Sequence, residues 1–103
     1  MSTNLRISAL LSLQRALLGE ITENMRAVMV SLGDKEIKFR VVFSGNPSSN
    51  DEERVSEIET EVIADFFEDV SVTGKAEASN PRERIQYKEN EVTVFRRAEN
   101  LTD

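Results

Sequence analysis

The side chains that most often perform catalysis are missing from this sequence. It contains no histidine and no cysteine, so the usual general base near neutral pH and the most reactive nucleophile are both absent. Lysine-activated serine chemistry would need a desolvated lysine, but all four lysines lie in hydrophilic stretches: Lys35, Lys38, Lys75 and Lys88. Paired carboxylates can act as acid and base in glycosidases, yet here they lie on a predicted surface helix. We therefore expect a protein that is not an enzyme.

The patterns that hold cofactors are absent as well. A phosphate-binding loop needs closely spaced glycines, whereas the four glycines are scattered at positions 19, 33, 45 and 74. Zinc sites use thiol or imidazole ligands, and the acidic residues do not follow the spacing of a calcium-binding loop. We expect neither a cofactor nor a metal.

Negative charge is concentrated in one segment. Residues 51–69 contain nine acidic side chains and one basic side chain, a net charge of −8, whereas the other 84 residues carry a net charge of +2. Five of these carboxylates share one face of the predicted helix and form what we name the acidic stripe: Glu53, Glu57, Glu61, Asp65 and Glu68. Like charges at this spacing destabilise an isolated helix by roughly 0.2–0.5 kcal/mol per pair. Stability alone therefore does not explain the stripe.

Two interpretations of the acidic stripe remain. It can be a solvated face that keeps the protein soluble. It can also be a docking surface that attracts a basic partner and selects it by complementary potential. We favour the second interpretation and predict that the stripe is the partner-binding site.

The acidic segment is predicted to form a helix that begins after a loop at 44–50. Ser49 or Asn50 caps this helix, Glu52 or Glu53 completes a capping box, and the helix runs to about Asp69. Its buried stripe, with two flanking residues, comprises Val55, Ile58, Val62, Phe66, Ile63 and Phe67. Glu59 falls within this apolar arc, so it is expected either to pair with Arg6 or Arg26 at the edge of the core or to contact a partner.

An earlier helix is predicted for residues 4–18, with Gly19 as its stop. Its buried face comprises Leu5, Ala9, Leu13, Ala16 and Leu17. A second apolar strip on this helix consists of Ile7, Leu11 and Leu18. This strip either packs inside the chain, against the sheet and the acidic helix, or contacts another subunit or partner.

Alternating apolar residues predict two strands, 25–32 and 36–44, joined by a hairpin turn at Gly33-Asp34-Lys35. Arg26 is expected on the core face of the first strand, whereas Arg40 is expected on the wetter face of the second. The predicted core faces comprise Val28, Val30, Leu32, Ile37, Phe39, Val41 and Phe43.

Two further strands are predicted at 70–78 and 92–96. Residues 79–90 are predicted to be a loop, in which Ile85-Gln86-Tyr87 is an alternative short strand, and residues 99–103 a frayed end. The order α-β-β-α-β-β indicates one α+β domain over 1–103. Both helices should lie on one face of a four-stranded, largely antiparallel sheet, but the order of the strands does not follow from the sequence.

Partners and location follow from the remaining features. The late basic residues Arg82, Arg84, Lys88, Arg96 and Arg97 lack aromatic stacking partners, and the net charge of −6 repels phosphate, so direct nucleic-acid binding is not expected. We expect these bases to balance the acidic helix, either within the molecule or across a dimer. The Leu-rich start is interrupted by charge, too short to span a membrane and unlike a secretory signal. We expect a cytoplasmic protein without membrane contact.

Three strings resemble a family of small bacterial immunity proteins of the contact-dependent growth inhibition or colicin type: residues 13–20 (LQRALLGE), 26–28 (RAV) and 59–66 (ETEVIADF). The resemblance covers most of the chain in order but carries no chemical signature. It implies binding to a toxin domain, often a basic nuclease, and blocking of its active site or substrate surface. The contact residues are inferred from charge, not from the family.

The resulting expectation is an immunity protein that neutralises a cognate toxin, a basic nuclease, by stoichiometric occlusion. The alternative is a structural domain without a toxin partner, which forms a homodimer through Ile7, Leu11 and Leu18. A third interpretation is that the acidic stripe mimics DNA phosphates toward a nucleic-acid-binding protein.

Overall fold

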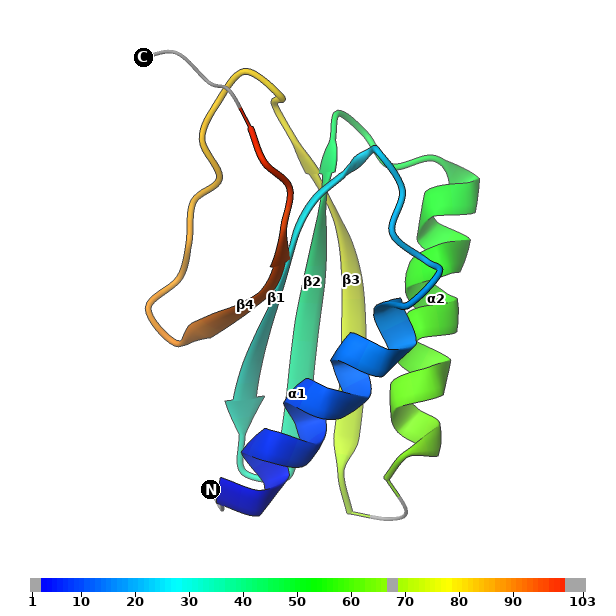
Figure 1. Cartoon of the computed structure of the whole chain (residues 1–103), viewed down its shortest axis with the longest axis vertical. Coiled ribbons are helices and arrows are strands. Elements are labelled where there is room, and N and C mark those ends of the chain that lie inside the picture. Colours follow the sequence, from blue (N-terminus) through cyan, green and yellow to red (C-terminus); the bar gives the residue numbers. More distant parts are fainter. Residues whose placement is uncertain (1–2, 67–68, 100–103) are drawn as a thin grey trace.

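Six elements follow one another in the predicted order in a computed structural model that describes residues 3–66 and 69–99 (Figure 1). They are α1 (Thr3–Leu17), β1 (Met25–Gly33), β2 (Glu36–Ser44), α2 (Ser49–Ala64), β3 (Ser71–Ser79) and β4 (Glu91–Arg96). Of the loop predicted at 79–90, Ser79 ends β3 and residues 80–90 form no strand, so the alternative strand at 85–87 is wrong. Within the described ranges no helix is long and apolar enough to cross a membrane.

The helix α2 begins earlier and ends earlier than predicted. Ser48 is its N-cap: the Ser48 side chain accepts from the backbone N–H of Asp51 (3.1 Å), and the Asp51 carboxylate accepts from the Ser48 backbone N–H (2.9 Å). The capping box therefore uses Asp51, because its short side chain is the one placed three residues after the cap. The helix does not reach Asp69, whose φ of 71° is incompatible with a right-handed helix.

The sheet has the strand order β3-β2-β1-β4. The strand β1 is antiparallel to both β2 and β4, as a largely antiparallel sheet requires. The strand β3 instead runs parallel to β2, with Ile37 opposite Val72 and Phe39 opposite Gly74. A parallel neighbour needs a crossover connection, and α2 provides it. The sheet is therefore mixed.

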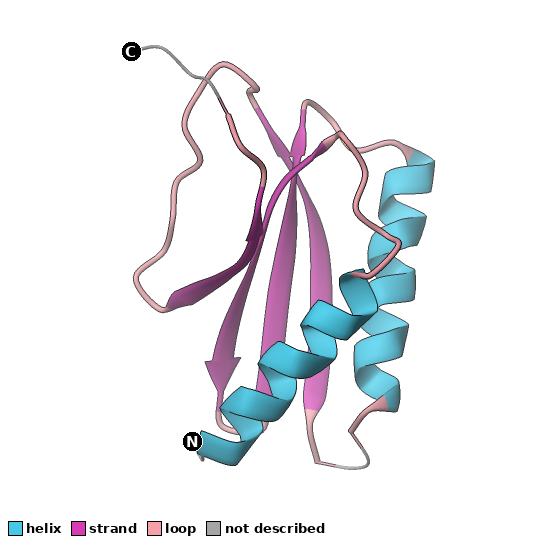
Figure 2. Ribbon diagram, viewed as in Figure 1, coloured by secondary structure: helices cyan, strands magenta, loops and turns pink. Residues whose placement is uncertain are grey.

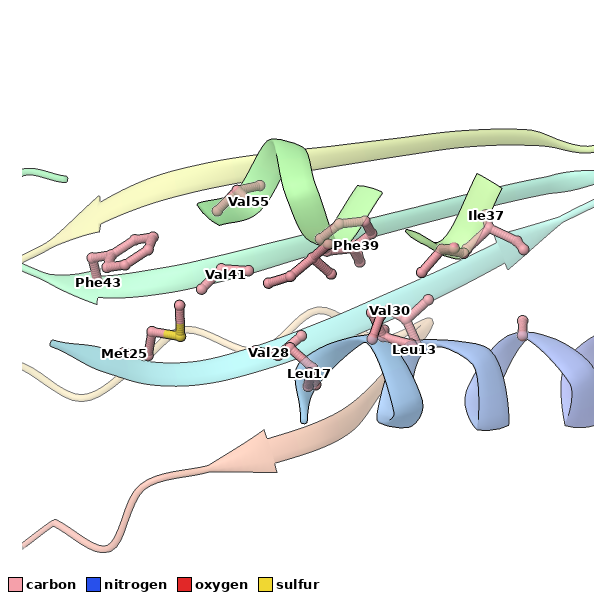
Figure 3. Packing of buried hydrophobic residues seen from close by; sticks show 14 residues of the cluster. Leu13, Leu17, Met25, Val28, Val30, Ile37, Phe39, Val41, Phe43 and Val55 are labelled. Carbon is pink, nitrogen blue, oxygen red and sulfur yellow. The ribbon is translucent and has the colours of Figure 1, made fainter. Parts of the chain in front are cut away.

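The main core lies between the two helices and one face of the sheet, as predicted (Figure 2). Leu13 and Leu17 of α1 lie against Val28 and Val30 of β1 (Figure 3). The helix α2 contributes Val55, Ile58 and Val62 to the same cluster. The predicted buried faces of both helices are confirmed, with two exceptions on α2: Ile63 is 47% exposed, so its predicted burial is wrong, and Phe67 lies outside the described residues.

Arg26 does not lie on this core face, contrary to the sequence prediction. Met25 pairs with Phe43 and Ala27 with Val42, so Arg26 is an extra residue in a β-bulge. The bulge resets the alternation, and Met25 takes the core position beside Val28. The side chain of Arg26 contacts the 79–99 segment instead.

The second apolar strip of α1 remains uncovered. Ile7, Leu11 and Leu18 expose 51%, 57% and 77% of their surface. The expectation that they pack on the sheet or on α2 is therefore wrong. The sheet face is already filled by the first strip, and α2 meets α1 through polar groups near Asp65.

Candidate partner-binding site

Three members of the acidic stripe stand free on the outer face of α2. Glu53, Glu57 and Glu61 are exposed, and within the described part of the chain none of them forms an ion pair. At a rise of about 1.5 Å per residue, their backbone positions are about 6 Å apart and span about 12 Å of helix. The buried residues Val55, Ile58 and Val62 fix the opposite face. The helix therefore presents a rigid row of negative charge to solvent.

Asp65 belongs to the fold rather than to this free row. Its carboxylate accepts from Ser12 Oγ (2.6 Å) and from Arg15 Nη2 (2.7 Å), both on α1. The hydrogen bond from Ser12, followed by that from Arg15, lowers the pKa of Asp65. Glu68, the last predicted member, lies outside the described residues. From here on, the free row means Glu53, Glu57 and Glu61.

Other carboxylates of the acidic segment also have partners within the chain. Glu59 accepts from the backbone N–H of Gly74 at 2.7 Å, so the predicted pairing with Arg6 or Arg26 is wrong. The carboxylate lies at the edge of the core, where it satisfies a donor of the edge strand β3. The only cation of α2, Arg54, is paired with Glu20 at 2.9 Å. The free row therefore has no neutralising base on its own helix.

Arg26 anchors the opposite side of the sheet, and it is fully buried despite its charge. Its guanidinium donates to both carboxylate oxygens of Glu99 (2.7 and 2.8 Å). The other donors reach Ser79 Oγ (3.0 Å), Asn80 O (3.1 Å) and Glu83 O (2.8 Å). All five N–H donors of the side chain are thus used. Of the predicted frayed end, Glu99 is held here, and residues 100–103 lie outside the described part.

Arg40 makes a second clamp of the same kind. Arg40 is only 8% exposed, so the prediction that it lies on a wet face is wrong. It pairs with Glu77 (3.0 Å) and Glu91 (2.8 Å) and donates to Gln86 O (2.8 Å). The hydrogen bond from Arg40 lowers the pKa of Glu91. The two arginines hold residues 79–99 against this side of the sheet.

The geometry leaves an exposed acidic face on α2, formed by Glu53, Glu57 and Glu61. In residues 3–66 and 69–99 no three potential ligands gather as a metal site. Residues 6–99 match the family described as MafI2 immunity protein. The chain belongs to the MafI2 immunity protein family. No curated protein is similar enough to the chain to count as a match.

Membership in the MafI2 immunity family supports a toxin-neutralising function and a protein toxin as partner. It also suggests an inhibitor that is not an enzyme. The predicted relation to immunity proteins is thereby confirmed. The family belongs to the Maf toxin system, which differs from the contact-dependent growth inhibition or colicin type that the sequence resemblance indicated.

Sequence reasoning missed both arginine clamps of this MafI2 family member. A signal was present, because Arg26 and Arg40 each interrupt strongly apolar strands, and a charge in a buried strand needs partners. Their partners lie 37 to 73 residues away in the sequence. Nothing in the local pattern identifies which acids they are.

The Arg26–Glu99 pair predicts a dependence of stability on acid pH. Hydrogen bonding from Arg26, opposed by burial, lowers the pKa of Glu99 from 4.5 to about 2. The folded state therefore resists protonation of Glu99, and its contribution to stability is complete above pH 4.5 and lost as the pH falls toward 2. We expect the difference in free energy of unfolding between the wild type and Glu99→Gln to be constant down to about pH 4.5 and then to shrink. Urea denaturation at a series of pH values measures it. A difference that already declines near neutral pH would contradict the assignment.

Proposed function

We propose that this protein neutralises a basic nuclease toxin in the cytoplasm by binding it in a stoichiometric complex, with the free row of α2 at the centre of the contact. Family membership carries the immunity function. The exposed, unpaired carboxylates Glu53, Glu57 and Glu61 support the choice of surface and the basic character of the partner.

The proposed mechanism is electrostatic and steric occlusion. A nuclease binds the phosphate backbone with lysine and arginine side chains. A row of carboxylates on a helix offers these lysine and arginine side chains an alternative anion. The body of the domain then keeps the nucleic acid out of the toxin's active site. No bond is made or broken, so inhibition requires one immunity protein per toxin.

Co-expression with the product of the neighbouring reading frame tests the immunity function. We expect that this product arrests growth when expressed alone, and that the immunity protein restores growth and co-purifies with it in a 1:1 ratio. A harmless neighbour, or growth arrest that persists without a complex, would remove the proposal for that partner. If the immunity protein rescues growth but the toxin does not degrade nucleic acid, the immunity function stands and only the proposal that the toxin is a nuclease is overturned.

The role of the free row is tested by the triple change Glu53→Lys, Glu57→Lys and Glu61→Lys. We expect the association rate with the toxin to fall about 10- to 100-fold at low salt, because the steering potential is reversed. The same rate for the wild type should fall steeply as salt rises, since charges beyond about 8 Å are screened at physiological ionic strength. Stopped-flow fluorescence at several salt concentrations measures both effects.

A matched control separates the free row from the net charge. The changes Glu23→Lys, Asp34→Lys and Glu83→Lys alter exposed acids on loops and shift the net charge by the same amount. We expect these changes to slow association far less than those on α2. Equal slowing by both triples would indicate a non-local charge effect, and no slowing by either would indicate an apolar contact surface.

A further inference from the structure

The two edge strands of the sheet differ in how well they are protected from pairing with another chain. The edge strand β3 carries Lys75 and Glu77, packs beside α2, and has its Gly74 N–H bound by Glu59. Charged side chains and covering elements are the usual protection of an edge. The other edge strand, β4, lies on the side of the sheet remote from α2 (Figure 1). Its four central residues, 92–95, are uncharged.

An apolar groove lies beside this second edge. It has a volume of about 610 Å³ and is formed by α1, the following loop and β4, with Leu11, Leu17, Leu18, Ile21, Val94 and Phe95 in its lining. Leu11, Leu18 and Ile21 also project into solvent, and Leu18 is the most exposed large apolar side chain in the described ranges. Exposed apolar side chains that gather beside an edge strand are typical of an interaction surface.

We propose that a second copy of this chain covers the groove, with the β4 strands of the two copies paired antiparallel across a two-fold axis. The two sheets then join into one of eight strands, in the order β3-β2-β1-β4-β4-β1-β2-β3. Because a two-fold axis perpendicular to the sheet keeps both α1 helices on the same face, their exposed strips meet above the seam. The proposal is independent of the toxin's identity.

The charges at the two ends of β4 select this occupant and this direction. Residues 88–91 contain Lys88, Glu89 and Glu91, a net charge of −1. The other end of the strand carries Arg96, its last residue, followed by Arg97, which pairs with Glu99, so residues 96–99 have a net charge of +1. Antiparallel pairing brings unlike ends together, whereas parallel pairing would bring like ends together. Glu91 is held by Arg40. Glu89 is thus the acid that meets Arg96 of the other copy, and neither forms an ion pair within the described residues.

Sedimentation of the full chain over a concentration series tests the dimer. We expect the wild type to sediment at twice its mass of 11.6 kDa, and Leu18→Glu to sediment as a monomer with an unchanged circular dichroism spectrum. The matched control is Ile63→Glu, the same kind of apolar-to-acidic change at an exposed residue of α2, and it should remain dimeric. A wild type that is monomeric throughout, or a dimer that persists in Leu18→Glu, would overturn the proposal.

The antiparallel direction has its own test. We expect Glu89→Arg and Arg96→Glu to weaken dimerisation about 2- to 5-fold for each of the two symmetry-related contacts, and the double variant to restore it. A double variant as weak as the single ones would overturn this pairing. Toxin binding separates the two proposals: a monomeric wild type whose toxin inhibition is lost in Leu18→Glu assigns the groove to the toxin instead.

Discussion

Arg26→Met is expected to lower the free energy of unfolding by about 3–5 kcal/mol, because it removes one partner of a buried charge pair. The hydroxyl of Ser79 and two backbone carbonyls lose the donation from Arg26, and the carboxylate of Glu99 keeps only the hydrogen bond from Arg97 Nη2 (2.9 Å). Methionine fills the volume but donates nothing. The cost therefore comes from unsatisfied groups rather than from a cavity.

Urea denaturation followed by circular dichroism measures this loss. The control is Arg82→Met, the same change at an exposed arginine, and it should stay within about 0.5 kcal/mol of the wild type. The double variant Arg26→Met, Glu99→Met should recover part of the loss, since both charges are then gone. A loss in Arg26→Met no larger than in the control would show that the clamp does not stabilise the fold.

Gly74→Ala is expected to cost about 1–3 kcal/mol through overpacking. The aromatic ring of Phe39 lies across Gly74, and an added Cβ would come within 2.3 Å of its Cζ atom. Phe39 is 3% exposed and belongs to the main core, so the ring has little room to move. At a site with free space, the same substitution would stabilise the protein by about 0.4–1 kcal/mol, because it lowers the conformational entropy of the unfolded chain.

Thermal and urea denaturation of Gly74→Ala test this steric account. Gly33→Ala is the matched control, because its new Cβ would meet only the flexible side chain of Glu36 at 3.2 Å. It should be neutral or slightly stabilising. In a Phe39→Leu background the cost of Gly74→Ala should shrink, since the contacting ring is removed. An unchanged cost in that background would show that the cost comes from the backbone at position 74 and not from contact with the Phe39 ring.

The periodic patterns of the sequence were sufficient to predict the elements. Alternation identified β1 and β2, and the spacing of Leu13 and Leu17 identified the buried face of α1. These signals are local, because burial of one face dictates which residue types recur along an element. The α+β class followed from the order of the elements. The parallel pairing of β3 with β2 did not, since it depends on which edge of the sheet α2 returns the chain to.

The candidate site was predictable only in part. The exposure of Glu53, Glu57 and Glu61 followed from their position opposite the buried stripe of α2. The pairing of Asp65, a predicted member of the acidic stripe, did not, because its partners on α1 are 50 and 53 residues away. The bulge at Arg26 also defeated a strict two-residue alternation. Both failures arise where tertiary contacts override a local period.

The clamp between Arg26 and Glu99 has a consequence for synthesis. The two residues are separated by 73 positions, which a ribosome covers in about 4–15 s. Throughout that interval the β1–β2 hairpin lacks both β4 and the carboxylate that neutralises its buried arginine. The clamp between β1 and the end of the chain therefore cannot close until almost all of the described sequence has been translated.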